Sequence, residues 1–122
     1  MRYLYTKTHE YICIGTGKTV QVGISDYAQK QLGDIVYVNL PEAGQTFSKG
    51  EVFAAVESVK AASDILGPCD GIITKVNLEL DGRPELLNED PKKNWICEAE
   101  IRGSMPTDLM SEEKYLKYIE TL

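Results

Sequence analysis

Glu57-Ser58-Val59-Lys60-Ala61 is the stretch that decides the fold, because it joins two segments with the composition of β-strands. The segment before it, residues 52–56, is apolar, and residues 62–66 after it form a second candidate strand. Two strands joined so closely fold back on each other as a hairpin, and a lysine at the joint projects into solvent. We therefore predict a β-hairpin with Lys60 at its tip.

The composition of this tip differs from that of a generic tight turn. It contains no Asn-Gly or Asp-Gly pair, which two-residue hairpin turns prefer. Small side chains surround one long amine instead, which leaves the amine open to an acylating enzyme. An amide on Lys60 would put a flexible tether on a rigid tip and bring its cargo to several active sites at high effective concentration. Gly44 and Gly71 bracket the tip, each before an apolar segment, which predicts two similar sheets meeting at Lys60.

Further strands are predicted on both sides of the hairpin. Residues 19–24 alternate between apolar and polar side chains, as in a half-buried strand. Residues 35–38 form a dense apolar run, which predicts a strand. It should end before Pro41 or lie at a sheet edge there, because proline has no N–H to donate to a neighbouring strand. Strands are also predicted over 71–76 and near 95–101, the latter with Trp95, Cys97, Ala99 and Ile101 on one face.

Two helices are predicted in addition. The first spans residues 26–32 between Ser25 and Gly33, with Asp26 and Gln29 at the spacing of a capping box. The second lies near residues 112–121 and is capped by Ser111. Its apolar stripe is expected to comprise Tyr115, Leu116, Ile119 and Leu122. One extra helical turn is expected over 84–88, and the whole pattern indicates a single mostly-β domain, residues 1–122.

Composition and charge disfavour several classes of function. The chain has 122 residues and a formal net charge of −6, which disfavours nucleic acid and anionic lipid as partners. Its three cysteines include no C-x-x-C pair, so neither a zinc ribbon nor a redox motif is indicated; Cys13 and Cys97 are expected to be reduced core residues. No apolar stretch has membrane-spanning length. We expect a soluble protein of the bacterial cytoplasm, or of the mitochondrial matrix if it is a processed eukaryotic protein.

The segment around Lys60 resembles the lipoylation site of glycine cleavage H proteins. Further segments match in the same order and cover nearly the whole chain: Thr8-His9-Glu10, Val22 to Gln29 with Leu32-Gly33-Asp34, Leu40-Pro41-Glu42 with Gly44, Ser63-Asp64, Pro84 to Pro91, and the helix of Tyr115. Val59-Lys60-Ala61 differs from the Asp-Lys-Ala of acyltransferase lipoyl domains and from the Met-Lys-Met of biotin carriers. The resemblance implies a lipoyl/biotinyl-type barrel-sandwich hybrid, with two facing antiparallel sheets and the two helices added.

The same resemblance implies a carrier that catalyses no step itself. Lipoate would be attached to Lys60 as an amide by a lipoate ligase or a lipoyl/octanoyl transferase. The arm would take an aminomethyl group from glycine decarboxylase, a pyridoxal phosphate enzyme, and pass it to a tetrahydrofolate-dependent aminomethyltransferase. An FAD-containing dihydrolipoyl dehydrogenase would reoxidise the remaining dithiol. The carrier would supply positioning and protection.

The resemblance also implies roles for residues near Lys60. Glu57, Ser58, Val59 and Ala61 are expected to serve recognition by the lipoylating enzyme; the alternative is that they are ordinary strand-end residues.

A cleft for the loaded arm is expected from the same comparison. By position, Glu10 and Asp64 are candidates to pair with the cationic amine on the arm, with Thr8 as a hydroxyl ligand. The alternative is that Glu10 is a surface acid and Asp64 a turn former. His9, the only histidine, is expected to be structural, and no metal site is predicted.

Two departures from the family pattern leave alternatives open. Tyr11 stands where the family usually has tryptophan, and Lys92-Lys93-Asn94 replaces a longer, glycine-containing run before Trp95. One alternative is an H-like paralogue acting in lipoyl relay or regulation. Others are a non-lipoylated β-domain adaptor and a stand-alone enzyme, although the sequence offers no nucleophile–histidine pairing, phosphate loop or metal cluster.

Overall fold

The computed structural model describes residues 2–122, which form ten strands and four short helices. Seven strands make one antiparallel sheet in the order β10-β1-β2-β3-β9-β8-β5, and three make a second in the order β4-β6-β7. The strands are β1 (Arg2–Tyr5), β2 (Glu10–Ile14), β3 (Thr19–Ile24), β4 (Ile35–Asn39), β5 (Thr46–Phe47), β6 (Val52–Ser58), β7 (Ala62–Leu66), β8 (Gly71–Val76), β9 (Cys97–Ile101) and β10 (Met110–Ser111). The helices are α1 (Asp26–Leu32), α2 (Glu79–Gly82), α3 (Leu86–Glu89) and α4 (Glu112–Ile119).

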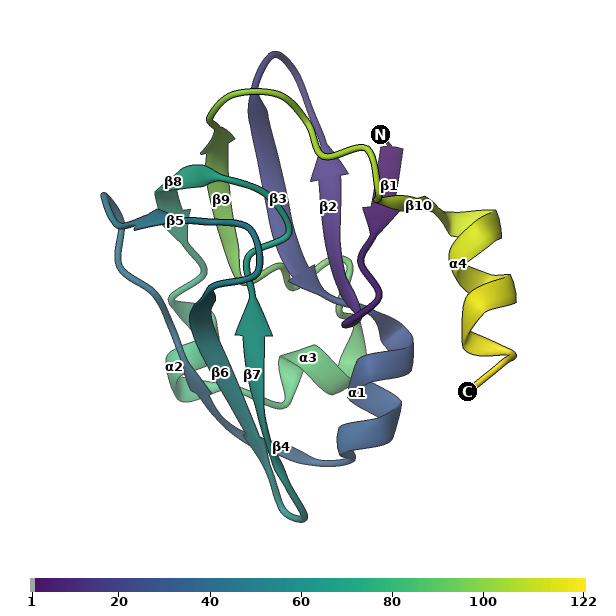
Figure 1. The fold of residues 1–122 in the computed structure, drawn as a ribbon. Coiled ribbons are helices and arrows are strands. Elements are labelled where there is room, and N and C mark those ends of the chain that lie inside the picture. The colour runs from purple at the N-terminus through teal and green to yellow at the C-terminus, as the bar shows by residue number, and fades with distance from the viewer. Residues whose placement is uncertain (1) are drawn as a thin grey trace.

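The two sheets face each other as a sandwich, as predicted, and enclose the main core. Inward side chains of the larger sheet, such as Val22 and Ile73, belong to one buried cluster with Val38, Val56 and Ile65 of the smaller sheet. In Figure 1 the β6–β7 hairpin extends downward from this body, and its tip forms the lower end of the molecule. The core therefore supports the base of the hairpin, while its tip is surrounded by solvent.

Pairing within the hairpin is as predicted, but the division of the sheets is not. Glu57 lies opposite Ala62 in the β6–β7 pair. The flanking strands β5 and β8 pair with each other in the larger sheet. The prediction that the segments on either side of Lys60 form two similar sheets is therefore wrong. Each sheet takes strands from both segments, because strands joined by a tight turn pair with each other.

Helix α1 spans the predicted residues, but its N-terminal cap differs from the prediction. Ser25 is the N-cap, with an extended backbone, and its Oγ accepts the Ala28 N–H at 3.1 Å. The Gln29 side-chain amide donates to the Asp26 carboxylate at 2.9 Å inside the helix. These two residues do not form a capping box, because Asp26 already lies within the helix and an N-cap residue lies outside it.

Helix α4 packs on the outer face of the larger sheet through Tyr115, with Tyr118 and Ile119 partly buried against the cluster to which Tyr115 belongs. Ser111 caps it as predicted, and Tyr115 is buried with its ring stacked 4.3 Å from that of Tyr5. The predicted apolar stripe is wrong for Leu116 and Leu122, which are 53% and 62% exposed. The helix is short, and only one narrow face of it reaches the sheet. This contact belongs to a second buried cluster, the tyrosine cluster, formed by Tyr5, Tyr11, Cys13, Met110 and Tyr115.

Strand β9 begins at Cys97 rather than at Trp95, so the predicted alternation holds only from Cys97 onward. Trp95 packs against the tyrosine cluster, with Lys75 Nζ 5.8 Å from the ring centroid. The next residue, Ile96, enters the main core and donates its N–H to the Val22 carbonyl at 2.8 Å. Ile96 and Cys97 are both buried in the main core, and two buried residues in succession break the alternation that a strand would show.

The remaining predictions concern short helices and cysteines. Helix α3 begins two residues later and ends one residue later than the helical turn predicted over 84–88. Helix α2 was not predicted. Among residues 2–122, the helices are too short and too polar for any of them to cross a membrane.

Cys13, Cys69 and Cys97 are buried and free, which confirms the prediction for Cys13 and Cys97. Burial raises the pKa of Cys69 to about 11 and that of Cys97 to about 12, so neither is a reactive thiolate at neutral pH.

Candidate functional site

A serine side chain shapes the tip between β6 and β7. The Ser58 N–H donates to the Ala61 carbonyl at 2.8 Å, and the Ser58 hydroxyl donates to the same carbonyl at 3.1 Å. The hydroxyl oxygen also accepts the N–H groups of Ala61 at 3.1 Å and Lys60 at 3.3 Å. Among residues 2–122, positive φ occurs at His9 and at five glycines, all outside this tip. The turn is therefore closed by the backbone N–H and the hydroxyl group of Ser58, and not by glycine.

Lys60 is exposed at this tip, and its amine is free. Within residues 2–122, its Nζ makes no hydrogen bond or ion pair. The stem of the side chain passes over Gly33, where an added Cβ would lie 3.6 Å from Lys60 Cε. The Val59 N–H donates to the Asp34 carbonyl at 3.0 Å, which ties the tip to the chain entering β4. Lys60 is thus an accessible amine on a turn that is anchored from one side.

The four neighbours of Lys60 predicted for recognition are presented together. Glu57 and Ala61 are exposed, and Val59 is 71% exposed. Ser58 is half-buried because its hydroxyl faces the turn. The structure thus gives Ser58 a role in shaping the tip that the sequence pattern did not indicate.

Glu10 is buried at the base of the same hairpin. It is only 2% exposed, and its Oε1 accepts the hydroxyl groups of Thr6 at 2.6 Å and Thr8 at 2.5 Å. Its Oε2 accepts the N–H of Leu66, the last residue of β7, at 3.3 Å. Burial raises the pKa of the Glu10 carboxyl above its ordinary value, and these hydrogen bonds act in the opposite direction. The alternative that Glu10 is a surface acid is therefore wrong.

The three residues predicted for a cleft line one small cavity. Its volume is about 20 Å³, room for about one water molecule. It lies between the β1–β2 turn, helix α1 and the hairpin. Its lining includes Thr8 from the turn, Glu10 from the start of β2, Ala28 and Leu32 from α1, and Asp64 from β7. Asp64 lies within a strand and is exposed, so the alternative that it is a turn former is wrong. The structure thus brings together the predicted set, one member buried and two exposed.

Two residues beside this cavity were not predicted to belong to it. His9 lines the cavity and has a φ of 75°, the one positive value at a non-glycine residue in the range 2–122. Its Nδ1 lies 2.8 Å from the hydroxyl of Tyr115, a residue 106 positions away. The sequence motif Thr8-His9-Glu10 could have pointed to His9 as part of this site. No local sequence pattern connects Tyr115 with it.

The two departures from the family pattern contact each other. Tyr11 is fully buried, and its hydroxyl donates to the Pro91 carbonyl at 2.6 Å and to the Lys92 carbonyl at 3.3 Å. Tyr11 therefore holds the loop that precedes Trp95. Neither Tyr11 nor that loop lines the cavity beside the hairpin.

The chemistry available to this site is that of an amine and of carboxylates. The exposed Lys60 amine can be acylated, and the acids of the cavity can face a cation. In the part of the chain that the structure describes, no group of three His, Cys, Asp or Glu side chains could hold a metal ion.

Comparisons with known proteins agree on one family. A profile of the glycine cleavage H-protein family matches residues 3–122. A probable glycine cleavage system H protein of Thermococcus gammatolerans is 48% identical over 120 residues, which cover 97% of this chain and 90% of that protein. The glycine cleavage system H protein of Thermotoga maritima is 49% identical over 117 residues, 93% of each chain. The crystal structure of an H protein from Mycobacterium marinum superposes with a TM-score of 0.88 at 34% identity, covering 98% of this chain and 97% of that one.

Proposed function

The chain belongs to the glycine cleavage H-protein family, and from this premise we propose that it is a non-catalytic lipoyl carrier with its cofactor on Lys60. The observation that carries the proposal is the free amine of Lys60, exposed at the tip of a hairpin that extends from the body of the molecule (Figure 1). An acylating enzyme can enclose such a tip without unfolding the sheet behind it.

The residues around Lys60 fit a covalently attached arm. Acylation of the amine breaks no hydrogen bond or ion pair within residues 2–122, and the turn beneath it is closed by Ser58 independently of the amine. When bound as an amide, lipoate would supply a disulfide that is reduced as it takes up the aminomethyl group derived from glycine, and a dithiol would remain once that group has been passed on. The chain itself supplies a rigid mount, from which one arm can serve several active sites at high effective concentration.

We assign Glu10, Asp64 and Thr8 to hold a cationic amine carried on the arm. Glu10 and Asp64 bring two carboxylates to one cavity, and a nearby carboxylate favours the charged form of an amine. The Thr8 hydroxyl donates to Glu10 and so orients its carboxylate. Because the cavity has room for only about one water molecule, its walls must separate before a larger group can enter.

The partners follow from membership of the glycine cleavage system. They are the pyridoxal phosphate-dependent glycine decarboxylase, the folate-dependent aminomethyltransferase, dihydrolipoyl dehydrogenase and an enzyme that attaches lipoate. For the last of these, the exposed surface of Glu57, Val59 and Ala61 frames the amine, and Ser58 sets the shape of the tip. The relatives compared above are bacterial and archaeal. In such a cell the proposal assigns the carrier to the cytoplasm.

A second candidate function rests on the contact between Tyr11 and the loop at Pro91 and Lys92. Both parts of this contact depart from the family pattern, which favours an altered docking surface and thus a role in lipoyl relay or regulation. A reconstituted glycine decarboxylation assay separates the two functions. A glycine cleavage carrier supports decarboxylation of glycine, and a relay protein does not.

Co-expression with a lipoate ligase tests the attachment site directly. We expect intact-mass measurement to show one lipoyl group, and peptide mapping to place it on Lys60. The variant Lys60→Arg should gain no lipoyl mass. Lys18→Arg, which alters an exposed lysine in the β2–β3 turn, is the matched control and should be modified like the wild type. A chain that gains no lipoyl mass under these conditions would be a non-lipoylated adaptor.

A further inference from the structure

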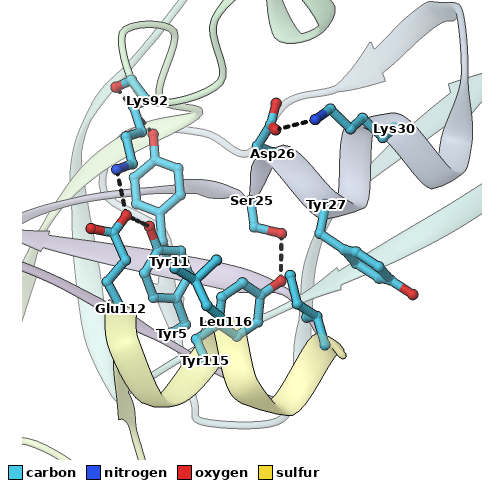
Figure 2. Close-up of a pocket in the computed structure, with 11 residues that line it drawn as sticks. Tyr5, Tyr11, Ser25, Asp26, Tyr27, Lys30, Lys92, Glu112, Tyr115 and Leu116 are labelled. Atoms are coloured by element: carbon cyan, nitrogen blue, oxygen red, sulfur yellow. Dashed lines mark hydrogen bonds and ion pairs between the residues drawn. The ribbon is translucent and has the colours of Figure 1, made fainter. Parts of the chain in front are cut away.

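The hydroxyl of Tyr115 joins two segments that are far apart in the sequence. It lies 2.7 Å from the Ser25 hydroxyl, a contact drawn as a dashed line in Figure 2, and 2.8 Å from Nδ1 of His9. Tyr115 and Ser25 are each 3% exposed. A single buried hydroxyl from the C-terminal helix therefore connects the β1–β2 turn to the start of α1.

Each of these two segments forms one wall of the cavity proposed for the arm. His9 lies between Thr8 and Glu10 on the first wall, in a left-handed conformation that a non-glycine residue adopts only when its surroundings hold it. Ser25 caps α1 and accepts the N–H of Ala28, which lines the second wall. The Ser25 N–H also donates to the His9 carbonyl at 2.9 Å, so the walls meet at this point.

One arrangement of the hydrogens satisfies all three groups of this network. The Ser25 oxygen already accepts the Ala28 N–H, so its own hydrogen is available to Tyr115, whose hydrogen is then available to His9. This arrangement needs a neutral imidazole with an unprotonated Nδ1. Burial lowers the pKa of His9 below its ordinary value, which favours that state at neutral pH. The three groups satisfy one another in a site shielded from water, where a hydrogen bond contributes most to rigidity.

We propose that Tyr115 is a positioning residue for the carrier function: its hydroxyl braces the Thr8–Glu10 turn and helix α1 and so sets the geometry of the cavity that holds the loaded arm. The inference rests on the proposed function, because only a carrier uses that cavity. It assigns the C-terminal helix to the site even though none of the residues of α4 lines the cavity.

The variant Tyr115→Phe tests the brace, because phenylalanine keeps the ring that stacks on Tyr5 and removes only the hydroxyl. In the unmodified protein, we expect hydrogen exchange at the Ser25 and Ala28 amides to accelerate roughly five- to tenfold, the factor that corresponds to one net hydrogen bond. In the loaded carrier, the lifetime of the cationic cargo should fall by a similar factor, while the rate of lipoylation at Lys60 stays unchanged. His9→Asn, which tolerates the left-handed backbone and lacks the imidazole, should behave like Tyr115→Phe.

Two matched controls separate the brace from a general loss of packing. Tyr5→Phe removes the hydroxyl donated to Glu112 beside the same stacked ring. Tyr118→Phe removes a hydroxyl that α4 donates to the Lys7 carbonyl rather than to Ser25. Both should leave exchange at Ser25 and Ala28 unchanged. Equal acceleration in either control would overturn the proposal, because the effect would then not depend on the bridge.

The outcomes also separate this inference from the proposed function. Unchanged exchange at Ser25 and Ala28 in Tyr115→Phe would overturn the brace, whatever happens at Lys60. Faster exchange with an unchanged cargo lifetime would also overturn it, because the brace would then not serve the arm. A wild-type chain that is never lipoylated would instead contradict the carrier function, and exchange in the unmodified protein would still report whether the hydroxyl holds the two walls.

Discussion

Two hairpin tips of this molecule each present an exposed lysine, and only one of them has the surroundings of a site. Lys18 lies in the β2–β3 turn and Lys60 in the β6–β7 turn. Figure 1 shows these two turns at opposite ends of the molecule. The β2–β3 turn uses glycine in the ordinary way, with Gly17 at a φ of 62°. The β6–β7 turn uses the Ser58 hydroxyl and is tied to the Asp34 carbonyl.

The comparison teaches that the exposure of a lysine amine is a weak indicator of an attachment site. The contacts that hold its turn in place are a strong indicator. Lys18 has the exposure of a solubilising charge. Lys60 is exposed as well, but the strand that leaves its turn carries Asp64 to the cavity and Leu66 to the buried Glu10. The β6–β7 hairpin therefore connects an accessible amine to a buried acid, and each of the following changes tests one part of that connection.

Moving the lysine by one position should have the largest effect. In the double variant Val59→Lys with Lys60→Val, the amine leaves the tip in a different direction, because neighbouring side chains of a turn point apart. A displaced reacting group of this kind lowers the rate of an enzymatic step by roughly a hundredfold. We expect such a loss in the initial rate of lipoylation, followed by mass spectrometry with purified ligase. A double variant modified at the wild-type rate would show that the tip has no positional requirement.

The hairpin with Lys60 was predictable from the sequence because its determinants are local. Two apolar segments, a short joint and one amine lie within a few residues, and the capped helix after Ser25 is equally local. The burial of Glu10 was not predictable, because one of its hydrogen-bond donors, Leu66, lies 56 positions away. Tyr115 was predicted as part of an apolar stripe, but its hydroxyl partners lie 90 and 106 positions away. Such contacts depend on how the sheets pack and leave no periodic signal in the chain.

Glu10 should give the protein a distinctive dependence of stability on pH. It begins β2 and bonds the end of β7, so the two hairpins meet at this carboxyl. Its pKa is raised by burial, so between the unfolded and folded pKa values the folded state binds more protons, and the free energy of unfolding falls as pH rises. Glu10→Gln should remove this fall in the free energy of unfolding. Urea unfolding of the variant and the wild type, compared from about pH 4 upward, measures the difference.

A matched control for this dependence is Glu112→Gln. The pKa of Glu112 is lowered, first by its hydrogen bond from Lys92, so the native carboxylate gives stability that is lost as pH falls. The two variants should therefore change the pH profile with opposite signs. Equal signs would contradict the assignment of Glu10 as a carboxyl held in a desolvated site.

Removing the Ser58 hydroxyl should weaken one tip and leave the other intact. Ser58→Ala loses the three hydrogen bonds of the hydroxyl and keeps the bond from the Ser58 N–H to the Ala61 carbonyl, and we expect a loss of roughly 1–2 kcal/mol in the free energy of unfolding. The control is Thr16→Ala in the β2–β3 turn, where the backbone carbonyl, and not the side chain, accepts the Thr19 N–H. That change should stay within about 0.5 kcal/mol. Urea unfolding measures both variants, and equal losses would mean that the hydroxyl does not hold the tip.

Gly17→Ala is expected to have the smallest effect on the attachment site, and it completes the comparison from the other side. Gly17 has open space around it, so the cost in the free energy of unfolding comes only from the left-handed backbone, which costs an alanine roughly 1–2 kcal/mol. Gly17→Asn should cost less than Gly17→Ala, because asparagine tolerates this conformation. Urea unfolding reports the order of the two variants, and lipoylation at Lys60 should proceed at the wild-type rate in both. A slower rate would show that the β2–β3 turn influences the distant tip, and the difference between the two lysines could then no longer be explained by the immediate surroundings of each turn.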